Sequence, residues 1–382
     1  MIGELAKVRE SLTPPPCDGL RIAWAPFAHP DAPSGYGVIA GKLAVALSQA
    51  GACVLDHTEF GWDVAVAVSL PSAWPFPGGA RVRNAEALIP GTPIPMHQGS
   101  SKRRADLCWH TMFECDPIPT GWAEILNRCA AVWAPSTHSA NLFRDAGVTA
   151  PIFISGYGVD ASIFHPLRRK PAGDGPMKFL AWAPGFAGRK NLLGTIKAFL
   201  AAHLPEKDAV LEVKVNAGGG TPVLKDETGR VFSNVSVIEA NWQASQVAEW
   251  LRSGDVLIYL SAGEGFGLQP LEAMACGVCA IVADNTGMQE YLRTDVALPV
   301  VCREKEISPI YSMRFAGGPF YQMVPSRDQA IAHIRWCFDH PIEAAKIGRA
   351  AAAYVADKWT WQIAGAKALA ALQERFGDGR QG

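Results

Sequence analysis

The chain has 382 residues, of which 49% are hydrophobic and 19% are charged, so it is long enough for two domains that each bury a core. Its 35 lysines and arginines against 36 aspartates and glutamates give a net charge of −1, which provides no electrostatic reason to expect nucleic acid as a partner. The first ten residues lack a signal-peptide pattern, no apolar run approaches the ~20 residues of a membrane span, and we therefore expect a cytoplasmic protein.

The nine cysteines are scattered along the chain. Only Cys276 and Cys279 form a C-x-x-C pair, and no second pair or histidine cluster completes a zinc site. An odd number of cysteines also suits reduced thiols. We expect these two residues to be small buried hydrophobic side chains rather than metal ligands.

The first predicted unit is a strand, a glycine-containing loop and a helix. Residues 20–25 are apolar and typical of a buried strand, and Gly35 and Gly37 open a helix that continues to about Ala50. This order is that of the first unit of a dinucleotide-binding type of fold. The G-x-G-x-x-G pattern is incomplete, with Ala40 at its last position, and by itself it is a weak indication.

Further strands follow at about 53–56, 63–69 and 106–113. Residues 72–95, between the second and the third of these strands, are rich in proline and glycine, and their pattern predicts neither a helix nor a strand. The cluster Lys102-Arg103-Arg104 is interpreted as a solvated loop, with a contact to anionic headgroups or to an acidic acceptor as the alternative.

His110, Glu114 and Asp116 lie where the strand 106–113 ends, and this end of a parallel strand borders the ligand crevice.

The alternation of strand and helix restarts at 177–183 after a basic and then Gly/Pro-rich stretch. Arg189 and Lys190 stand just before the N-terminus of a helix predicted over 191–202. Backbone N–H groups and two cations at one place suit a pyrophosphate. The alternative is a basic pair that faces the solvent.

The stretch 255–292 is the most informative. The apolar strand 255–261 is followed by a loop with three glycines and by a helix from about Leu268, whose first backbone N–H groups favour a bound anion. Glu264 lies in the loop and Glu272 one turn into the helix. A carboxylate accepts hydrogen bonds, so the two glutamates suit sugar hydroxyls rather than phosphate. A ligand whose phosphate binds the backbone amides and whose diols bind the two carboxylates would be a nucleotide sugar.

The spacing E-x7-E at Glu264 and Glu272 resembles the signature of the retaining glycosyltransferases of family GT4, which have the GT-B fold. The segment Gly158-Val-Asp with Phe164 and Pro166 also resembles that family, as do the stretches TMFECD and APSTHS in the same order. The resemblance covers roughly residues 20–375 and implies two Rossmann-like parallel-sheet domains that face a cleft. It places the first domain at 1–167, a linker at 168–175 and the second, donor-binding domain at 176–358, with a C-terminal helix in 359–382 that packs back on the first domain.

The family also implies roles for individual residues. Glu264, Lys190 and His110 would be catalytic: Glu264 orients donor-sugar hydroxyls, Lys190 stabilises the departing diphosphate, and His110 lines the reacting centre. Glu272 would hold the ribose diol. The remaining donor-binding residues would be Gly35, Gly37, Arg189, Phe266, Gly267 and Leu268. No metal and no cofactor is expected beyond the substrate nucleoside diphosphate sugar, and the acceptor would be a hydroxyl of a glycan, a lipid or a small molecule.

Several points stay open at this stage. The family usually has an arginine where this chain has Gly185, so a second phosphate-binding cation is expected from Arg189, from elsewhere, or not at all. A nucleotide-sugar epimerase, a phosphorylase and a catalytically silent nucleotide-sugar binding module of the same fold are the alternatives. Residues 302–325 are interpreted as an insertion of unassigned function. Many relatives glycosylate lipids or surface polysaccharides, so this protein is also expected to make peripheral contact with a membrane. The sequence does not indicate the oligomeric state.

Overall fold

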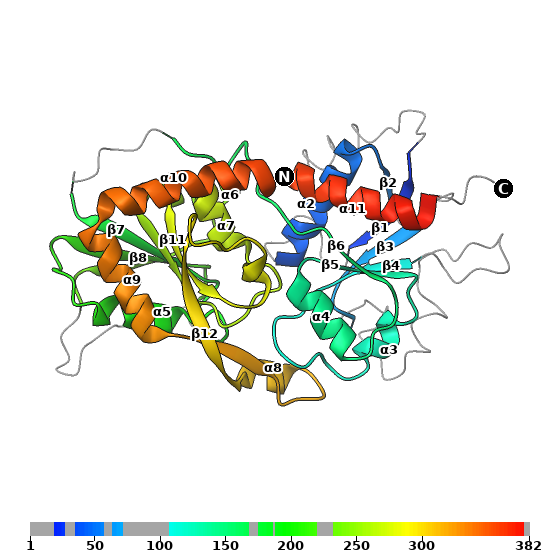
Figure 1. Cartoon of the computed structure of the whole chain (residues 1–382), viewed down its shortest axis with the longest axis horizontal. Helices are drawn as coiled ribbons and strands as arrows, with labels where there is room; N and C mark the ends of the chain where they lie inside the picture. The colour runs from blue at the N-terminus through cyan, green and yellow to red at the C-terminus, as the bar shows by residue number, and fades with distance from the viewer. Residues whose placement is uncertain are drawn as a thin grey trace.

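The computed structural model describes residues 19–26, 35–56, 63–71, 107–167, 175–185, 188–219 and 232–377. Two sheets organise these residues, and each is flanked by helices (Figure 1). The first sheet has the strand order β2-β1-β3-β4-β5-β6, and the second has the order β13-β12-β11-β10-β7-β8-β9. All pairings are parallel except that of β12 with β13.

The N-terminal sheet is built from short, apolar strands that are buried on both faces, as parallel strands covered by helices are. Val64 to Val68 are all buried, which explains why the central strand β3 contains only alanine and valine. The strands are β1 (Arg21–Pro26), β2 (Cys53–Asp56), β3 (Val64–Val68), β4 (Leu107–His110), β5 (Ala131–Ala134) and β6 (Ile152–Ile154). The helices are α2 (Gly35–Gln49), α3 (Trp122–Leu126) and α4 (Thr137–Asp145).

The C-terminal sheet follows the same principle, with β10 (Val256–Tyr259) and β11 (Cys279–Asp284) almost wholly buried at its centre. The other strands are β7 (Met177–Trp182), β8 (Ala209–Val215), β9 (Val235–Glu239), β12 (Leu298–Ile307) and β13 (Tyr321–Pro325). The helices are α5 (Leu192–Ala201), α6 (Ala244–Ser253), α7 (Leu268–Ala275), α8 (Pro309–Arg314), α9 (Arg327–Asp339) and α10 (Pro341–Lys358).

The last helix, α11 (Trp361–Phe376), returns to the first domain. Whereas α10 covers the C-terminal sheet, α11 lies along the N-terminal domain beside α2 (Figure 1). Gly365 permits this close packing, because a Cβ atom there would lie 2.6 Å from Ala46. The predicted fold class, two parallel-sheet α/β domains with a helix that crosses back, is therefore confirmed. The domain boundaries at 167 and 176 stay predictions.

Residues 302–325, which the sequence left unassigned, form an arm that extends from the C-terminal sheet to the N-terminal domain. The arm consists of the end of β12, α8 and β13, and α8 lies below the gap between the two sheets in Figure 1. Its Phe320 is fully buried in a hydrophobic cluster with Phe113 and Trp122 of the N-terminal domain. Tyr321 forms an antiparallel bridge with Asp116. A segment of the second domain thus completes the core of the first.

One connection is irregular and one expectation differs from the structure. After β11, residues Thr286–Glu290 form a short 3₁₀ turn, η3. Cys276 and Cys279 are fully buried and form no disulfide bond, as expected, but Cys53 is disulfide-bonded, so the expectation of reduced thiols is wrong for that residue.

The burial of Phe320 makes a first prediction. Phe320→Ala should lower the free energy of unfolding by about 3–5 kcal/mol, because a fully buried aromatic ring leaves a cavity that its neighbours fill only in part. Met313→Ala, on the same arm with 81% of the residue exposed, should change it by less than about 0.5 kcal/mol. Urea denaturation of both variants is the measurement. Equal values for the two would show that the arm does not contribute to the core.

Candidate active site

The site forms where β10 ends and the loop 260–267 leads into α7. Gly267 caps the helix with a φ of 87°, a left-handed conformation that favours glycine. A Cβ atom at this position would also lie 2.7 Å from Met288 and 2.9 Å from the Tyr291 hydroxyl. The Tyr291 hydroxyl donates to the Gly267 carbonyl at 2.7 Å. The start of α7 is thus fixed by its own backbone geometry and by the residues after β11.

Glu264 is the central side chain of this loop and is 5% exposed. Lys190 Nζ lies 2.7 Å from its Oε1, and Arg189 Nη1 lies 3.1 Å from its Oε2. The hydroxyls of Ser261 and Tyr259 donate to the same Oε1 at 2.6 and 2.8 Å. The structure therefore brings together Glu264, Arg189 and Lys190, three residues that the sequence placed in the site.

These contacts determine the charge state of the group. Burial alone would raise the pKa of Glu264, but the charges of Lys190 and Arg189 outweigh it and hold that pKa at about 2. Burial lowers the pKa of Lys190, which the charge of Glu264 counteracts. Glu264 is consequently ionised at all ordinary pH values.

Arg189 connects this site to the N-terminal domain. Its Nη2 lies 2.8 Å from Glu114 Oε1, and its Nη1 also donates to the Gly263 carbonyl. Its Nε donates to the Tyr311 hydroxyl at 2.9 Å. Burial opposes the charge of Arg189, but Glu114 and Glu264 keep its pKa well above the usual value. The guanidinium group is thus bound from three directions by protein groups.

The glycines of the loop allow the two domains to approach each other. A Cβ atom on Gly263 would lie 2.5 Å from the Glu114 carbonyl oxygen, and one on Gly265 would lie 2.2 Å from Met112 Sδ. The Ser136 hydroxyl donates to the Gly265 carbonyl at 2.7 Å. Two of the three loop glycines, Gly263 and Gly265, therefore make room for the opposite domain.

Glu272 lies one turn into α7. The residue is half-buried, and its carboxylate makes no hydrogen bond with any described residue. Burial raises the pKa of Glu272 to about 8, although the charge of Lys42 acts in the opposite direction. Lys42 belongs to α2 of the other domain and pairs with Asp160 at 2.8 Å. The carboxyl group of Glu272 therefore has no hydrogen-bond partner among the described residues and lies within the electrostatic influence of Lys42 from the other domain.

His110 does not contact Glu264 or Lys190. It is fully buried at the end of β4, where its Nδ1 lies 3.0 Å from the Trp133 carbonyl and its Nε2 2.8 Å from the Tyr157 hydroxyl. Burial lowers the pKa of His110 to about 3, so the ring is neutral. Tyr157 in turn packs against Phe266, with ring centroids 5.0 Å apart. The structure thus places His110 behind the glycine loop rather than beside Glu264.

The other predicted donor-binding residues surround the same loop. Phe266 is buried among aromatic rings, so only its backbone is available to a ligand, while Leu268 and Gln269 at the start of α7 are partly exposed. Gly35 and Gly37 lie in the first turn of α2 in the opposite domain. Lys102, Arg103 and Arg104 lie outside the described residues.

Sequence reasoning missed the groups that hold Lys190. Its Nζ donates to the Tyr259 hydroxyl at 3.0 Å and to Gln269 Oε1 at 3.1 Å, and Tyr259 also hydrogen-bonds Gln269. Tyr259 is the one polar side chain of the strand β10, and this exception in an apolar run is the signal that could have identified it. Lys42 and Tyr311 were missed as well, because only the packing of the domains brings them to the site.

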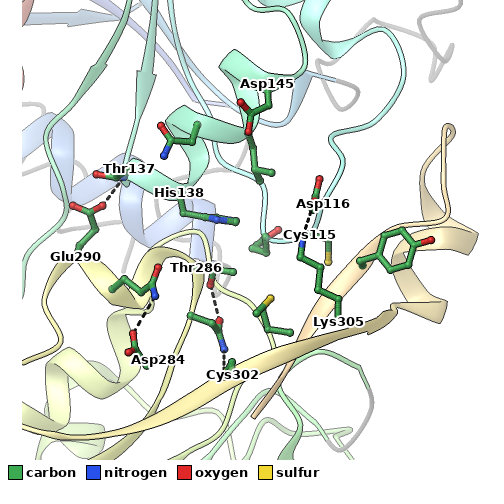
Figure 2. A pocket seen from close by; sticks show the side chains of 17 residues that line it. Cys115, Asp116, Thr137, His138, Asp145, Asp284, Thr286, Glu290, Cys302 and Lys305 are labelled. Atoms are coloured by element: carbon green, nitrogen blue, oxygen red, sulfur yellow. Dashed lines mark hydrogen bonds and ion pairs between the residues drawn. The ribbon is translucent and has the colours of Figure 1, made fainter. Parts of the chain in front are cut away.

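A cavity of about 610 Å³ adjoins the site on the side of α4, η3 and the arm (Figure 2). It begins beside Glu264, whose backbone N–H donates to the hydroxyl of Thr286 in the cavity wall. Its charged lining consists of five carboxylates and one ammonium group: Glu114, Asp116, Asp145, Asp284, Glu290 and Lys305. Figure 2 shows the ion pair of Lys305 with Asp116, at 2.7 Å, on one side of the cavity. The excess of carboxylates disfavours an anionic ligand in this cavity.

Among the described residues, no group of three or more His, Cys, Asp or Glu side chains has an arrangement that could hold a metal ion. None of the helices in the described ranges combines the length and apolarity needed to cross a membrane.

Comparison with known proteins gives three findings. Residues 180–308 match the family model described as "Glycosyl transferases group 1". The D-inositol 3-phosphate glycosyltransferase of Paenarthrobacter aurescens is 31% identical over 139 residues, and the match covers 34% of each chain. Among solved structures, a sucrose-phosphate synthase from Thermosynechococcus elongatus has a TM-score of 0.66 at 14% identity, covering 94% of this chain and 99% of that one. The Anabaena protein Alr3699/HepE, solved with UDP-glucose, has a TM-score of 0.55 at 15% identity, and the match covers 87% of this chain and 81% of that one.

The chain is therefore a GT-B protein, because its two sheets and its crossing C-terminal helix match these structures over most of its length. Residues 180–308 of its second domain match the group 1 glycosyl transferases, so the predicted resemblance to such glycosyltransferases is confirmed for this segment. The match spans about a third of the length of the curated relative.

The raised pKa of Glu272 predicts a dependence of stability on pH. Between its reference pKa of 4.5 and its folded pKa of about 8, the folded chain binds more protons than the unfolded chain. The contribution of Glu272 to stability is therefore present below this range and is lost as the pH rises through it. In Glu272→Gln we expect the melting temperature to fall less than that of the wild type between pH 5 and 8.5. Glu374→Gln, at an exposed position of α11, is the control, and identical slopes in all three proteins would contradict the prediction.

Proposed function

We propose that this protein is a retaining, metal-independent glycosyltransferase that moves a sugar from a nucleoside diphosphate sugar to a hydroxyl acceptor. The observation that carries the proposal is the arrangement of Glu264 and Lys190 at the start of α7, with Glu272 one helical turn further on. These groups stand in the segment that matches the group 1 family model. A solved neighbour of the same fold contains UDP-glucose, which supports a nucleotide sugar as the donor class.

The donor would bind along the N-terminal part of α7. The unpaired carboxyl group of Glu272 would accept hydrogen bonds from the ribose diol, a contact that requires its ionised form and would lower its raised pKa. The backbone N–H groups of Phe266, Gly267 and Leu268 would hold sugar or phosphate oxygens at the helix start. Gly35 and Gly37 would add backbone N–H groups from α2.

Lys190 would stabilise the departing diphosphate. As the bond between the anomeric carbon and the diphosphate oxygen breaks, negative charge grows on that oxygen, and a nearby ammonium group lowers the energy of this state. Glu264 holds Lys190 Nζ at 2.7 Å and would orient donor-sugar hydroxyls through its remaining acceptor positions. Arg189 would add positive charge beside Lys190 while it holds Glu264 in place. Charge neutralisation by these two cations is the basis for proposing a metal-independent reaction.

The leaving phosphate oxygen would take the proton of the acceptor hydroxyl as that hydroxyl attacks the anomeric carbon from the same face. This route retains the anomeric configuration and needs no separate general base. His110 would act on the donor only through Tyr157 and the glycine loop, since both of its ring nitrogens have protein partners. The cavity beside Glu264 offers carboxylates as hydrogen-bond acceptors, which suits a hydroxyl-bearing acceptor without negative charge.

A catalytically silent nucleotide-sugar binding module is the second candidate. It is favoured by Gly185, which stands where the family usually has an arginine, and by Lys190 and Arg189, whose N–H groups face protein partners in this structure. Such a module would bind the donor and release no nucleoside diphosphate. No described residue suggests the closed acid–base site of an epimerase.

The experiment is a thermal-shift panel with UDP, GDP, ADP and dTDP and with one sugar conjugate of each. One nucleotide should stabilise the wild type by about 3–4 kcal/mol when its concentration is several hundred times its Kd. Glu272→Ala and Lys190→Ala should lose this stabilisation, because they remove the ribose and diphosphate contacts.

Lys346→Ala is the matched control, since that lysine is exposed on α10 and far along the chain from the site. A wild-type protein that no nucleotide stabilises at millimolar concentration would refute the donor site. Stabilisation that persists in Glu272→Ala and Lys190→Ala would place the nucleotide elsewhere. Stabilisation without any turnover of the sugar conjugate would favour the silent module.

A further inference from the structure

Tyr311 lies on the arm, outside every motif that indicated the function, and yet it contacts the candidate active site. It belongs to α8, the short helix of the arm 302–325. Its hydroxyl accepts a hydrogen bond from Arg189 Nε at 2.9 Å and donates to Glu114 Oε2 at 2.8 Å. One hydroxyl group therefore joins a residue of the second domain to a residue of the first.

The three side chains form a closed ring of contacts. Arg189 Nη2 pairs with Glu114 Oε1 at 2.8 Å, which completes the ring that the Tyr311 hydroxyl began. The same guanidinium reaches Glu264 Oε2 at 3.1 Å through Nη1. Only about 15% of the side-chain surface of Arg189 and 14% of that of Glu114 is exposed, so water competes little for these hydrogen bonds. Arg189 thus holds Oε2 of Glu264, while Lys190, Ser261 and Tyr259 hold Oε1, and Arg189 is itself held by Tyr311 and Glu114.

The arm holds Tyr311 in this place through its contacts with the N-terminal domain. The ring of Tyr311 packs edge-on against Phe113, with centroids 5.4 Å apart, and Phe113 also contacts Phe315 and Phe320 of the arm. The backbone N–H of Thr120 donates to the Ala316 carbonyl at 3.0 Å. Tyr311 can bridge Arg189 and Glu114 only while the arm is docked on the first domain.

We propose that Tyr311 is a positioning residue of the donor site: its hydroxyl holds Arg189 and Glu114 together and thereby fixes the carboxylate of Glu264 when the arm joins the two domains. This inference rests on the proposed function, because Glu264 is the residue that would orient the donor sugar. Burial raises the pKa of the Tyr311 hydroxyl, so the group stays protonated and keeps its donor role toward Glu114.

Tyr311→Phe tests the proposal, because it removes the hydroxyl and keeps the aromatic packing. Tyr354→Phe is the matched control: this tyrosine of α10 is half-buried, and no hydrogen bond of its hydroxyl is present in the described ranges. The assay is the release of nucleoside diphosphate from UDP-glucose, GDP-mannose, ADP-glucose and dTDP-glucose without an acceptor. Tyr311→Phe should lower kcat by about ten- to a hundredfold and change KM by less than about threefold, because a displaced Glu264 affects the reacting sugar more than the nucleotide contacts.

A double-mutant cycle with Glu114→Gln separates positioning from a general loss of stability. If both side chains act through Arg189, the double variant should have nearly the same kcat as whichever single variant has the lower kcat. Melting temperatures should stay within about 2–4 °C of the wild type. If Tyr311→Phe does not fold, Glu114→Gln alone tests the same network, with the same split expected between kcat and KM.

Three results would overturn the proposal. The first is that Tyr311→Phe has the same kcat and KM as Tyr354→Phe. The second is that Tyr311→Phe changes KM alone. The third is that the fold-decrease in kcat of the double variant equals the product of the fold-decreases of Tyr311→Phe and Glu114→Gln. A wild-type protein that turns over none of the four donors would refute the proposed function and the positioning role together. An active wild type with an unaffected Tyr311→Phe would refute the positioning role only.

Discussion

The ion pairs of Glu264 with Lys190 and Arg189 are the interaction on which the rest of the site depends. A buried carboxylate is stable only when cations and hydrogen-bond donors surround it, and removing one partner of such a pair typically costs about 3–5 kcal/mol. Two loops must therefore meet, the loop before α5 with both cations and the loop before α7 with Glu264. Their meeting point is the carboxyl edge of the parallel sheet, where β10 ends.

The second constraint is the close contact between the domains at this point. Gly263 and Gly265 let backbone and side-chain atoms of the first domain lie directly against the loop. The arm adds Phe320 to the hydrophobic cluster of the first domain, and α11 adds a further contact along α2. The groups that carry charge at the site are therefore enclosed by both domains, which strengthens their electrostatic interactions and excludes water.

The sequence predicted what depends on local patterns. The alternation of strands and helices, the start of α7 at a glycine and the charged residues Glu264, Lys190 and Arg189 all follow from spacing and side-chain chemistry. The environment of His110, the two glycines that face the other domain and the role of residues 302–325 could not be predicted, because each depends on contacts between separate segments. The partners of His110 lie 23 and 47 residues further along the chain, and the contacts of the glycine loop and of the arm join segments more than 100 residues apart. Tyr311 illustrates this limit, since a tyrosine in a short helix has no recognisable pattern until the arm is docked.

The most direct test of the central claim is a crystal structure with the nucleoside diphosphate sugar that stabilises the protein. We predict that the diphosphate lies within hydrogen-bond distance of Lys190 Nζ and of the first backbone N–H groups of α7, with the ribose diol on Glu272 and sugar hydroxyls near Glu264. A nucleotide bound with its diphosphate away from Lys190, for example in the cavity between α4 and the arm, would contradict the account.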